Sequence, residues 1–374
     1  MPEVTALDSY AAVDAAAWDA LIGEQAPFLE HAYLYALERS GAACPATGWW
    51  PRPVVLHEQG ALIGAAPGWL TTHSRGEFVY DHAWADAAAR YGIAYYPKLV
   101  VGVPFTPVAG GRLLVHPSAE PSATRRALLD GLVRAASAAH GLHILFNPEE
   151  EATWLAQRGL FPRLQFQYQW ENRGWATFED FLGALTAKKR KNIRQERAKA
   201  AHYELEWHED PAGEVLDHLQ RCYAHTCDQF GAWGARYLNR DTFEALSVSW
   251  RGRVLGLTAR LDGELVAGAY LVRKGAALYG RYWGALGEHP FLHFELCYYA
   301  PIELCLREGI QRFEPGHGGE HKLARGFVPQ LTWSSHGLAH RGLHDALLQH
   351  SAAEAARVRE VADELAGVGS PYRR

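Results

Sequence analysis

A pair of landmarks occurs twice, in the same order, along this chain of 374 residues, and the repetition constrains the fold more than any other feature. The first landmark is two short apolar segments joined at a glycine, at residues 53–70 and again at 254–272. Gly60 and Gly263 stand where a tight β-hairpin turn needs a positive φ. The sequence therefore predicts two related hairpins.

The second landmark follows the hairpin in each half of the chain. It is a helix end, a glycine and a short apolar strand closed by proline, at residues 140–148 and 308–315. The first half also carries extra residues at about 75–115, which we interpret as an insertion between matching elements. Two landmarks in one order predict a duplicated α/β module, with the first copy at 1–170 and the second at 171–374.

The order of elements is clearest in the second half. Thr177-Phe-Glu-Asp180 is a capping box that predicts the start of a helix. The sequence then predicts a basic helix at 186–201, a strand at 203–210 and two helices, at 211–230 and from 241. A hairpin at 254–272, a strand at 276–286, a helix at about 292–308 and a strand at 311–315 follow. This order predicts an α/β fold, of the α+β kind with a mixed sheet. An amphipathic C-terminal helix at 343–366 is expected to pack on the second module.

Composition excludes several classes of protein. A formal net charge of -5 and a pI near 6.4 argue against a protein that coats polyanions in general, but they leave room for a local basic site. Five cysteines without a CxxC pair, and a start without the pattern of a secretory signal, favour reduced thiols in the cytoplasm. No stretch approaches the roughly 20 apolar residues of a membrane span, so no integral membrane segment is expected.

Five phrases of the chain carry a resemblance to known proteins. They are YYPKL (95–99), PFTP (104–107), KRKNIR (189–194), LHFELCYY (292–299) and EPGHGGEHKLARGF (314–327). The element order resembles the GNAT acyltransferase fold, and two copies in one chain resemble the Fem-type peptidoglycan aminoacyltransferases. The phrases resemble the Fem-like predicted N-acyltransferase family of bacterial proteins. The resemblance implies two tandem GNAT-like acyltransferase modules and transfer of an acyl or aminoacyl group to nitrogen.

The loop at 316–327 concentrates ionisable side chains among four glycines. Glycine lets a backbone approach a ligand closely and turn its amides toward an anion. Lys322 and Arg325 add charge for a phosphate or carboxylate, and Glu320 and His321 could handle a proton. The alternative is a plain turn with a solvated polar rim. We favour a functional loop, because plain turns rarely need five ionisable groups.

The same loop also contains the pattern HxxEH, from His317 to His321. That pattern belongs to a zinc-protease signature, which needs a helix to bring both imidazoles to one face. Pro315-Gly316 and Gly318-Gly319 argue against a helix there. No metal is therefore expected.

Residues His293 and Glu295 open the helix after the third strand. The GNAT resemblance implies that this helix start faces the acyl donor, where its free amides attract a negative group. Alternatively, His293 caps the helix and Glu295 suits its dipole. Just before it, Arg281-Tyr-Trp-Gly284-Ala-Leu286 is similar to the pyrophosphate loop of CoA-dependent GNAT enzymes, but Leu286 stands where a small residue is usual. Its bulk is expected to crowd a pyrophosphate.

The basic helix holds seven Lys and Arg residues, among them Arg190 and Arg194, against the single acid Glu196. Such a local field suits a polyphosphate or the acceptor stem of an RNA. The alternative is an ordinary solvated face. In the insertion of the first half, Tyr96 and Lys98 either line a groove or pack internally.

Together these observations favour an N-acyltransferase in which an amine attacks an activated ester or thioester carbonyl. The base is expected to be Glu295, or His321 with Glu320, while Lys322 and Arg325 hold an anionic part of donor or acceptor. These residues and His293 are expected to converge on one cleft. The acceptor would be a small-molecule or peptide amine. The Fem-like resemblance favours aminoacyl-tRNA as donor, with acyl-CoA as the alternative co-substrate and no other cofactor. A non-catalytic binding protein on the same fold is the remaining hypothesis.

Overall fold

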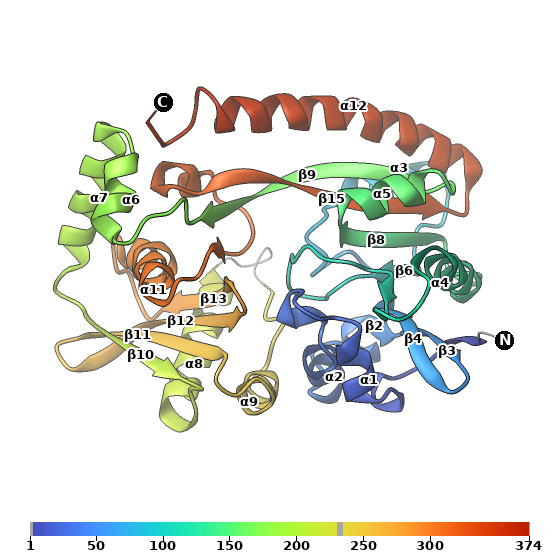
Figure 1. Cartoon of the computed structure of the whole chain (residues 1–374), viewed down its shortest axis with the longest axis horizontal. Coiled ribbons are helices and arrows are strands. Elements are labelled where there is room, and N and C mark those ends of the chain that lie inside the picture. Colours follow the sequence, from blue (N-terminus) through green and yellow to red (C-terminus); the bar gives the residue numbers. More distant parts are fainter. Residues whose placement is uncertain (1–2, 230–234, 374) are drawn as a thin grey trace. The chain divides into compact units, whose positions relative to one another are not determined.

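The computed structural model describes residues 3–229 and 235–373, which form two compact units (Figure 1). Unit 1 consists of Met1–Gln165 and Leu331–Glu360, and unit 2 of Phe166–Gln330 and Val361–Arg374. Each unit combines helices with β-strands, so the fold class expected from the sequence is confirmed: α/β, in two tandem GNAT-like modules. Residue 230, the predicted end of a helix, lies outside the described residues.

The sheet of unit 2 begins with four antiparallel strands. They are β10 (Glu204–Glu209), β11 (Val254–Leu261), β12 (Glu264–Lys274) and β13 (Ala277–Ala285). Strand β14 (Arg312–Glu314) then runs parallel to β13, and the second part of β9 (Phe161–Glu171) pairs antiparallel with β14. The helices are α6 (Phe178–Ala184), α7 (Ala187–Ala200), α8 (Gly213–Gln229), α9 (Arg240–Ser249), α10 (Leu292–Phe294) and α11 (Ala300–Glu308), with a π-helical turn Glu295–Tyr299 joining the last two. The elements thus follow the order that the sequence predicts.

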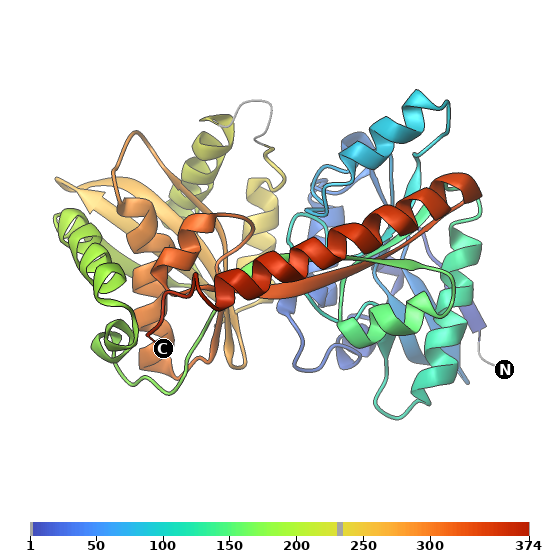
Figure 2. The ribbon, with the colours of Figure 1, turned by 90° about the horizontal axis from the view of Figure 1, so that it is seen from above.

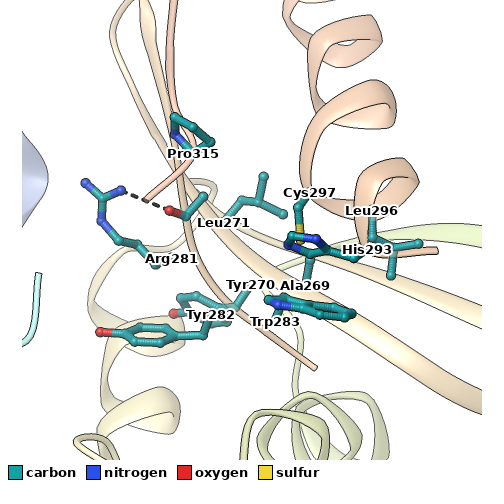
Figure 3. A pocket seen from close by; sticks show the side chains of 11 residues that line it. Ala269, Tyr270, Leu271, Arg281, Tyr282, Trp283, His293, Leu296, Cys297 and Pro315 are labelled. Atoms are coloured by element: carbon teal, nitrogen blue, oxygen red, sulfur yellow. Dashed lines mark hydrogen bonds between the residues drawn. The ribbon is translucent and has the colours of Figure 1, made fainter. Parts of the chain in front are cut away.

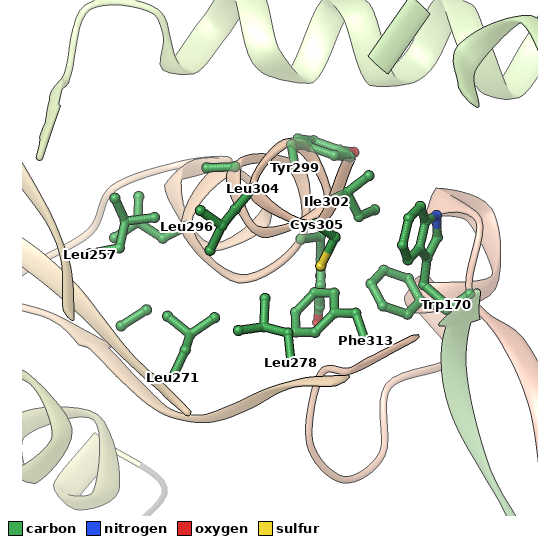
Figure 4. Close-up of a cluster of buried hydrophobic side chains, with 14 of the residues drawn as sticks. Trp170, Leu257, Leu271, Leu278, Leu296, Tyr299, Ile302, Leu304, Cys305 and Phe313 are labelled. Carbon is green, nitrogen blue, oxygen red and sulfur yellow. The ribbon is translucent and has the colours of Figure 1, made fainter. Parts of the chain in front are cut away.

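A large apolar core lies between the α10–α11 helix and the strands of unit 2 (Figure 4). One face of the α10–α11 helix, with Leu296, Ile302 and Leu304, packs on side chains of the sheet such as Leu257 and Leu278. Each such side chain stabilises the fold by roughly 1.5–3 kcal/mol when fully buried. This core fixes the helix whose first turns border the site described below.

Unit 1 repeats much of this arrangement. Its antiparallel strands are β1 (Glu3–Ala6), β3 (Val54–Glu58), β4 (Ala61–Ala66) and β7 (Leu114–Val115), and a second group is ordered β15 (Val328–Leu338), β8 (Gly141–Asn147), β6 (Lys98–Val101), β5 (Gly68–Thr71) and β2 (Trp49–Pro51). Its helices are α1 (Ala15–Ala20), α2 (His31–Arg39), α3 (His82–Arg90), α4 (Pro121–Ala135) and α5 (Glu149–Ala156). Strand β6 runs parallel to β8 as β13 runs parallel to β14, and the two predicted hairpins are β3–β4 and β11–β12.

The segment 75–115 is more than an insertion. It contains α3, but it also contains β6 and β7, which pair with β5 and β4. These two short strands occupy the sheet position that β13 occupies in unit 2. The expectation of a simple insertion is therefore wrong for β6 and β7, because their backbones complete the sheet of unit 1.

The expected division into 1–170 and 171–374 also needs correction. Strand β15 pairs with β8 from Trp333↔Asn147 to Leu338↔Gly141, which gives residues 331–360 to unit 1. Helix α12 (Arg341–Ala366) follows, and its Leu343 and Leu347 pack with Trp84 and Phe161 of unit 1. The helix lies beside β15 in both views (Figures 1 and 2). The expectation that residues 343–366 pack on the second module therefore fails for the part up to Glu360. In the part of the chain described, no helix has the length and apolar character of a membrane span.

Candidate functional site

The parallel strands β13 and β14 of unit 2 separate soon after they meet. Ala277–Tyr279 of β13 pair with Arg312–Glu314 of β14, and β14 ends there. Pro315 follows, and Gly316 turns the chain with a φ of 87°. Strand β13 continues to Ala285 with a bulge: Tyr270 pairs with Tyr282, and Leu271 pairs with Gly280. Arg281 is the extra residue of this bulge, and bulges re-aim side chains beside functional sites.

The separation leaves a cavity of about 50 Å³ (Figure 3). Its walls are mostly apolar and aromatic, with Ala269, Tyr270, Leu271, Tyr282 and Trp283 from the sheet and Leu296 and Cys297 from the helix. The ring of His293 lies against Trp283, with centroids 4.4 Å apart. Arg281 also lines the cavity, and its guanidinium donates to the carbonyl oxygens of Gly280 (2.9 Å) and Glu314 (3.4 Å).

Lys322 approaches the same region from a short 3₁₀ helix, Glu320–Arg325 (hereafter the Lys322 helix). Its side chain is buried, and Nζ donates to the carbonyl oxygens of Gly316 (2.7 Å) and His317 (3.2 Å). Burial lowers the pKa of Lys322 to about 7; the thiol of Cys297 opposes this shift and Arg281 adds to it. The amine thus titrates near neutral pH.

Two imidazoles accompany Lys322. Tyr298 Oη and His321 Nε2 share a hydrogen bond of 2.8 Å, and the His293 and His321 rings are 5.8 Å apart. Burial and the nearby His321, Lys322 and Arg325 lower the pKa of His293 to about 3. Burial and the same two cations also lower the pKa of His321. Both rings are therefore neutral at physiological pH, which is the state that accepts a proton.

Arg325 is tied to helix α7 and does not point into the cavity. Its guanidinium donates to both carboxylate oxygens of Glu196, at 3.0 and 2.7 Å, and lies 3.4 Å from the centre of the Phe294 ring. Tyr299 donates its hydroxyl to the same carboxylate. The cluster anchors the end of the Lys322 helix.

The two acidic candidates lie elsewhere. Glu295 is buried and accepts two hydrogen bonds from Arg197, at 3.1 and 3.0 Å. It borders a second groove, of about 450 Å³, formed with side chains of α6, α7 and β10. Burial has the largest effect and raises the pKa of Glu295, although the nearby Arg197 opposes this shift. Glu320 is exposed at the start of the Lys322 helix. The structure thus brings His293, His321, Lys322 and Arg281 together, but not Glu295 or Glu320.

The remaining candidates are spread over both units. Arg194 is exposed on α7 and pairs with Glu179 at 2.5 Å, and Arg190 is half-buried one turn earlier. Lys98 belongs to unit 1, fully buried, with Nζ 2.8 Å from the Glu77 carboxylate and 2.5 Å from that of Asp81. Tyr96 Oη shares a hydrogen bond of 2.7 Å with Ser74 Oγ in the same cluster. Lys98 therefore has an internal ionic role in unit 1.

Sequence reasoning did not assign roles to three neighbours of the site. Cys297 and Trp283 line the cavity, and Glu196 holds Arg325. One signal existed for Glu196, because it is the single acid in a helix otherwise rich in cations. Among residues 3–229 and 235–373, no group of three or more His, Cys, Asp or Glu side chains is arranged to hold a metal ion.

Glu295→Gln is expected to weaken the fold rather than the chemistry. The substitution keeps the shape but removes the charge that faces Arg197, so the free energy of unfolding should fall by about 1–2 kcal/mol in urea titrations. Glu303→Gln is the matched control, because Glu303 also binds Arg197 but is more exposed, so its loss should be smaller. A large loss of activity with an unchanged midpoint would instead indicate that Glu295 is the base.

Comparisons with known proteins agree with this architecture. Residues 9–374 match the FemAB-like family model, described as peptidoglycan biosynthesis/recognition. The crystal structure of FemX is similar, with a TM-score of 0.58, 12% identity, and coverage of 92% of this chain and 100% of that one. The C-terminal domain of a putative lysylphosphatidylglycerol synthetase from Agrobacterium fabrum gives a TM-score of 0.55, 12% identity, and coverage of 91% and 96%.

A tandem GNAT protein from the clavulanic acid biosynthesis pathway, determined without acetyl-CoA, gives a TM-score of 0.48 and 14% identity, with coverage of 91% of this chain and 99% of that one. No curated protein gives a significant sequence match. At these levels of identity the structural likeness concerns the fold.

Proposed function

The chain belongs to the FemAB-like family, described as peptidoglycan biosynthesis/recognition, and on that premise we propose that it is an N-acyltransferase that moves an acyl or aminoacyl group to an amine. Membership in the family supports group transfer of this general kind. The observation that carries the proposal within the molecule is the cavity lined by β12, β13 and the start of the α10–α11 helix, with Arg281, Lys322 and two neutral imidazoles at or beside it.

The proposed reaction requires an unprotonated acceptor amine, stabilisation of an oxyanion and a general base. The neutral amine of the acceptor attacks the carbonyl carbon of the donor, and the carbonyl oxygen becomes an oxyanion. Arg281 supplies positive charge for that oxyanion, and the Lys322 amine, which titrates near pH 7, supplies N–H donors that carry charge when it is protonated; both side chains are buried, where charges interact strongly. The same cations disfavour a protonated acceptor amine, and the attacking nitrogen must be unprotonated.

A base must then remove a proton from the attacking nitrogen. We assign this role to His321, whose ring is neutral, accessible, and oriented through Nε2 by Tyr298. The tetrahedral intermediate collapses to an amide, and the alcohol or thiol of the donor leaves with a proton. No covalent bond to the enzyme is required.

For the donor, we propose aminoacyl-tRNA ahead of acyl-CoA. Lys188-Lys189-Arg190-Lys191 stand at the start of α7, and the first turn of this helix has no acidic residue. Cations there oppose the helix dipole, so helix stability does not account for them. A polyanionic ligand would account for them.

The direct test is a transfer assay with the full chain. Labelled aminoacyl-tRNAs and acyl-CoAs are each offered with a panel of peptide and small-molecule amines, and the amide product is identified by mass spectrometry. Amide formation from aminoacyl-tRNA supports the proposal in full. Turnover with acyl-CoA alone would replace the donor, and tight binding of amines without turnover from any donor would favour a binding protein.

Charge reversal on α7 should weaken tRNA binding in a salt-dependent way. Each lost phosphate contact should reduce the slope of log K against log salt concentration by about 1. We therefore expect Arg190→Glu and Arg194→Glu each to weaken binding in titrations at 50 and 200 mM salt. Arg307→Glu is the control, since Arg307 is an exposed arginine of α11 on the same unit. An equal effect of the Arg307 variant would exclude α7 as the binding surface.

A further inference from the structure

The position of the Lys322 helix depends on contacts outside its own backbone. The helix lies between Gly319 (φ 86°) and Gly326 (φ 93°), and both glycines are in the left-handed region. Neither a regular helix nor a strand therefore continues through these two points to orient the segment. The positions of Lys322 and Arg325 therefore depend on a tertiary contact that fixes Gly326.

Tyr372, near the C-terminus, makes that contact. Its side chain is buried, and its hydroxyl donates a hydrogen bond of 2.5 Å to the carbonyl oxygen of Gly326. The tyrosine ring stacks on Trp175, with centroids 5.6 Å apart and an angle of 18° between the planes. The guanidinium of Arg173 covers the ring at 4.1 Å.

The backbone around Tyr372 is fixed to the segment that joins α6 to α7. The amide of Thr186 donates to the carbonyl oxygen of Pro371 (2.9 Å), and the amide of Arg373 donates to that of Ala184 (2.9 Å). Tyr372 also forms a β-bridge with Leu185. Tyr372 therefore links the base of α7, which carries Glu196, to the end of the helix that carries Arg325.

Gly326 is held so closely that no side chain fits. An added Cβ would lie 2.7 Å from the Phe181 ring and 3.3 Å from Tyr372 Oη, in addition to the unfavourable φ. Its carbonyl oxygen is thus fixed against a buried donor. If that donor is lost, a buried oxygen remains without a partner, which favours movement of the segment toward water.

We propose that Tyr372 is a positioning residue for the acyl-transfer site. It touches neither the cavity nor the reacting groups, but it fixes Gly326 and through it Lys322 and Arg325. The role in catalysis rests on the proposed function, whereas the control of the Lys322 position does not. Small displacements of such groups slow an enzyme strongly, since a shift of about 1 Å can reduce the rate roughly 100-fold.

The test compares two buried tyrosines of matched chemistry. Tyr372→Phe removes the hydroxyl that binds Gly326, and Tyr10→Phe removes a buried hydroxyl that donates to the carbonyl oxygen of Gly68 in unit 1 (3.2 Å). Both variants lose one buried hydrogen bond, so their melting temperatures should fall by similar amounts. Only Tyr372→Phe should alter the site.

Two readouts separate the positioning role from the proposed reaction. The first is the rate at which Lys322 reacts with acetic anhydride, followed by peptide mass spectrometry. It should rise at least about fivefold in Tyr372→Phe and stay unchanged in Tyr10→Phe. The second is transfer activity, where kcat should fall at least about tenfold with KM changed less than about twofold.

Each outcome has a distinct meaning. Altered Lys322 labelling in Tyr372→Phe alone supports the positioning role, even if no acyl transfer is found. Unchanged labelling in Tyr372→Phe, or the same change in Tyr10→Phe, overturns it. Altered labelling with undiminished kcat confines Tyr372 to a structural role and contradicts the catalytic part of the inference.

Discussion

Replacing Lys322 with methionine is expected to lower kcat of the acyl transfer at least about 100-fold, the usual loss when a preorganised oxyanion donor is removed. Methionine fills much of the same volume, so the cavity wall and the hydrophobic contacts of the lysine stem persist. The variant should fold, because the amine that disappears donates, within the described residues, to two backbone carbonyl oxygens, those of Gly316 and His317, and to no carboxylate. Circular dichroism and steady-state kinetics test the two halves of this expectation.

Lys98→Met is the informative control, because Lys98 is also a buried lysine. Its loss leaves the carboxylates of Glu77 and Asp81 buried together without their cation, so this variant should lose stability rather than chemistry. If Lys322→Met unfolds the protein and Lys98→Met does not, the Lys322 helix is a structural element and the proposed site is wrong.

The lowered pKa of Lys322 gives the same variant a pH signature. The pKa is about 7 in the folded chain and near the ordinary 10.5 in the unfolded chain, so the unfolded state binds more protons between these values. Stability therefore rises with pH across this window, and the cost of burying the lysine is greatest below pH 7. The melting temperature of Lys322→Met relative to wild type should be highest near pH 6.5 and fall toward pH 9.5. A difference that does not vary with pH would contradict the lowered pKa.

Local patterns of the sequence predicted individual elements well, because hairpins, caps and amphipathic helices depend on neighbouring residues. The glycine turns of β3–β4 and β11–β12 and the capping box at Thr177 are of this kind. The pairing partner of a strand is different. Strand β15 follows unit 2 in the chain, yet its backbone pairs with β8 of unit 1. Its side chains show no regular alternation, so the sequence does not indicate which strand it pairs with.

The site illustrates the same limit. The loop at 316–327 stood out by composition, and the structure brings its His321 and Lys322 beside His293. The role of Glu295 could not be deduced from its place at a helix start, since its partner Arg197 lies about 100 positions away in the sequence. A charged residue can be recognised locally, but whether it is committed to an ion pair depends on contacts distant along the chain.

The ion pair between Arg325 and Glu196 gives the second large effect. Arg325→Met leaves the Glu196 carboxylate half-buried beside Tyr299 without its cation, and Glu196→Met leaves the arginine unpaired over Phe294. Each single variant should lose about 2–3 kcal/mol of unfolding free energy, somewhat below the usual value for a fully buried pair because Glu196 retains some exposure. Each should also lose activity, because the end of the Lys322 helix is released.

The double variant distinguishes a pair from two independent contributions. With both charges replaced by apolar side chains, nothing charged remains buried, and the loss of stability should be smaller than the sum of the two single losses by about 1–3 kcal/mol. Activity should stay low in the double variant, because methionine at both positions restores neither the bidentate geometry nor the position of Lys322. Urea unfolding and kcat measured on the same three proteins give the comparison. Strictly additive stability losses would show that Arg325 and Glu196 act separately, and recovery of kcat in the double variant would show that the bidentate pair is not what positions Lys322.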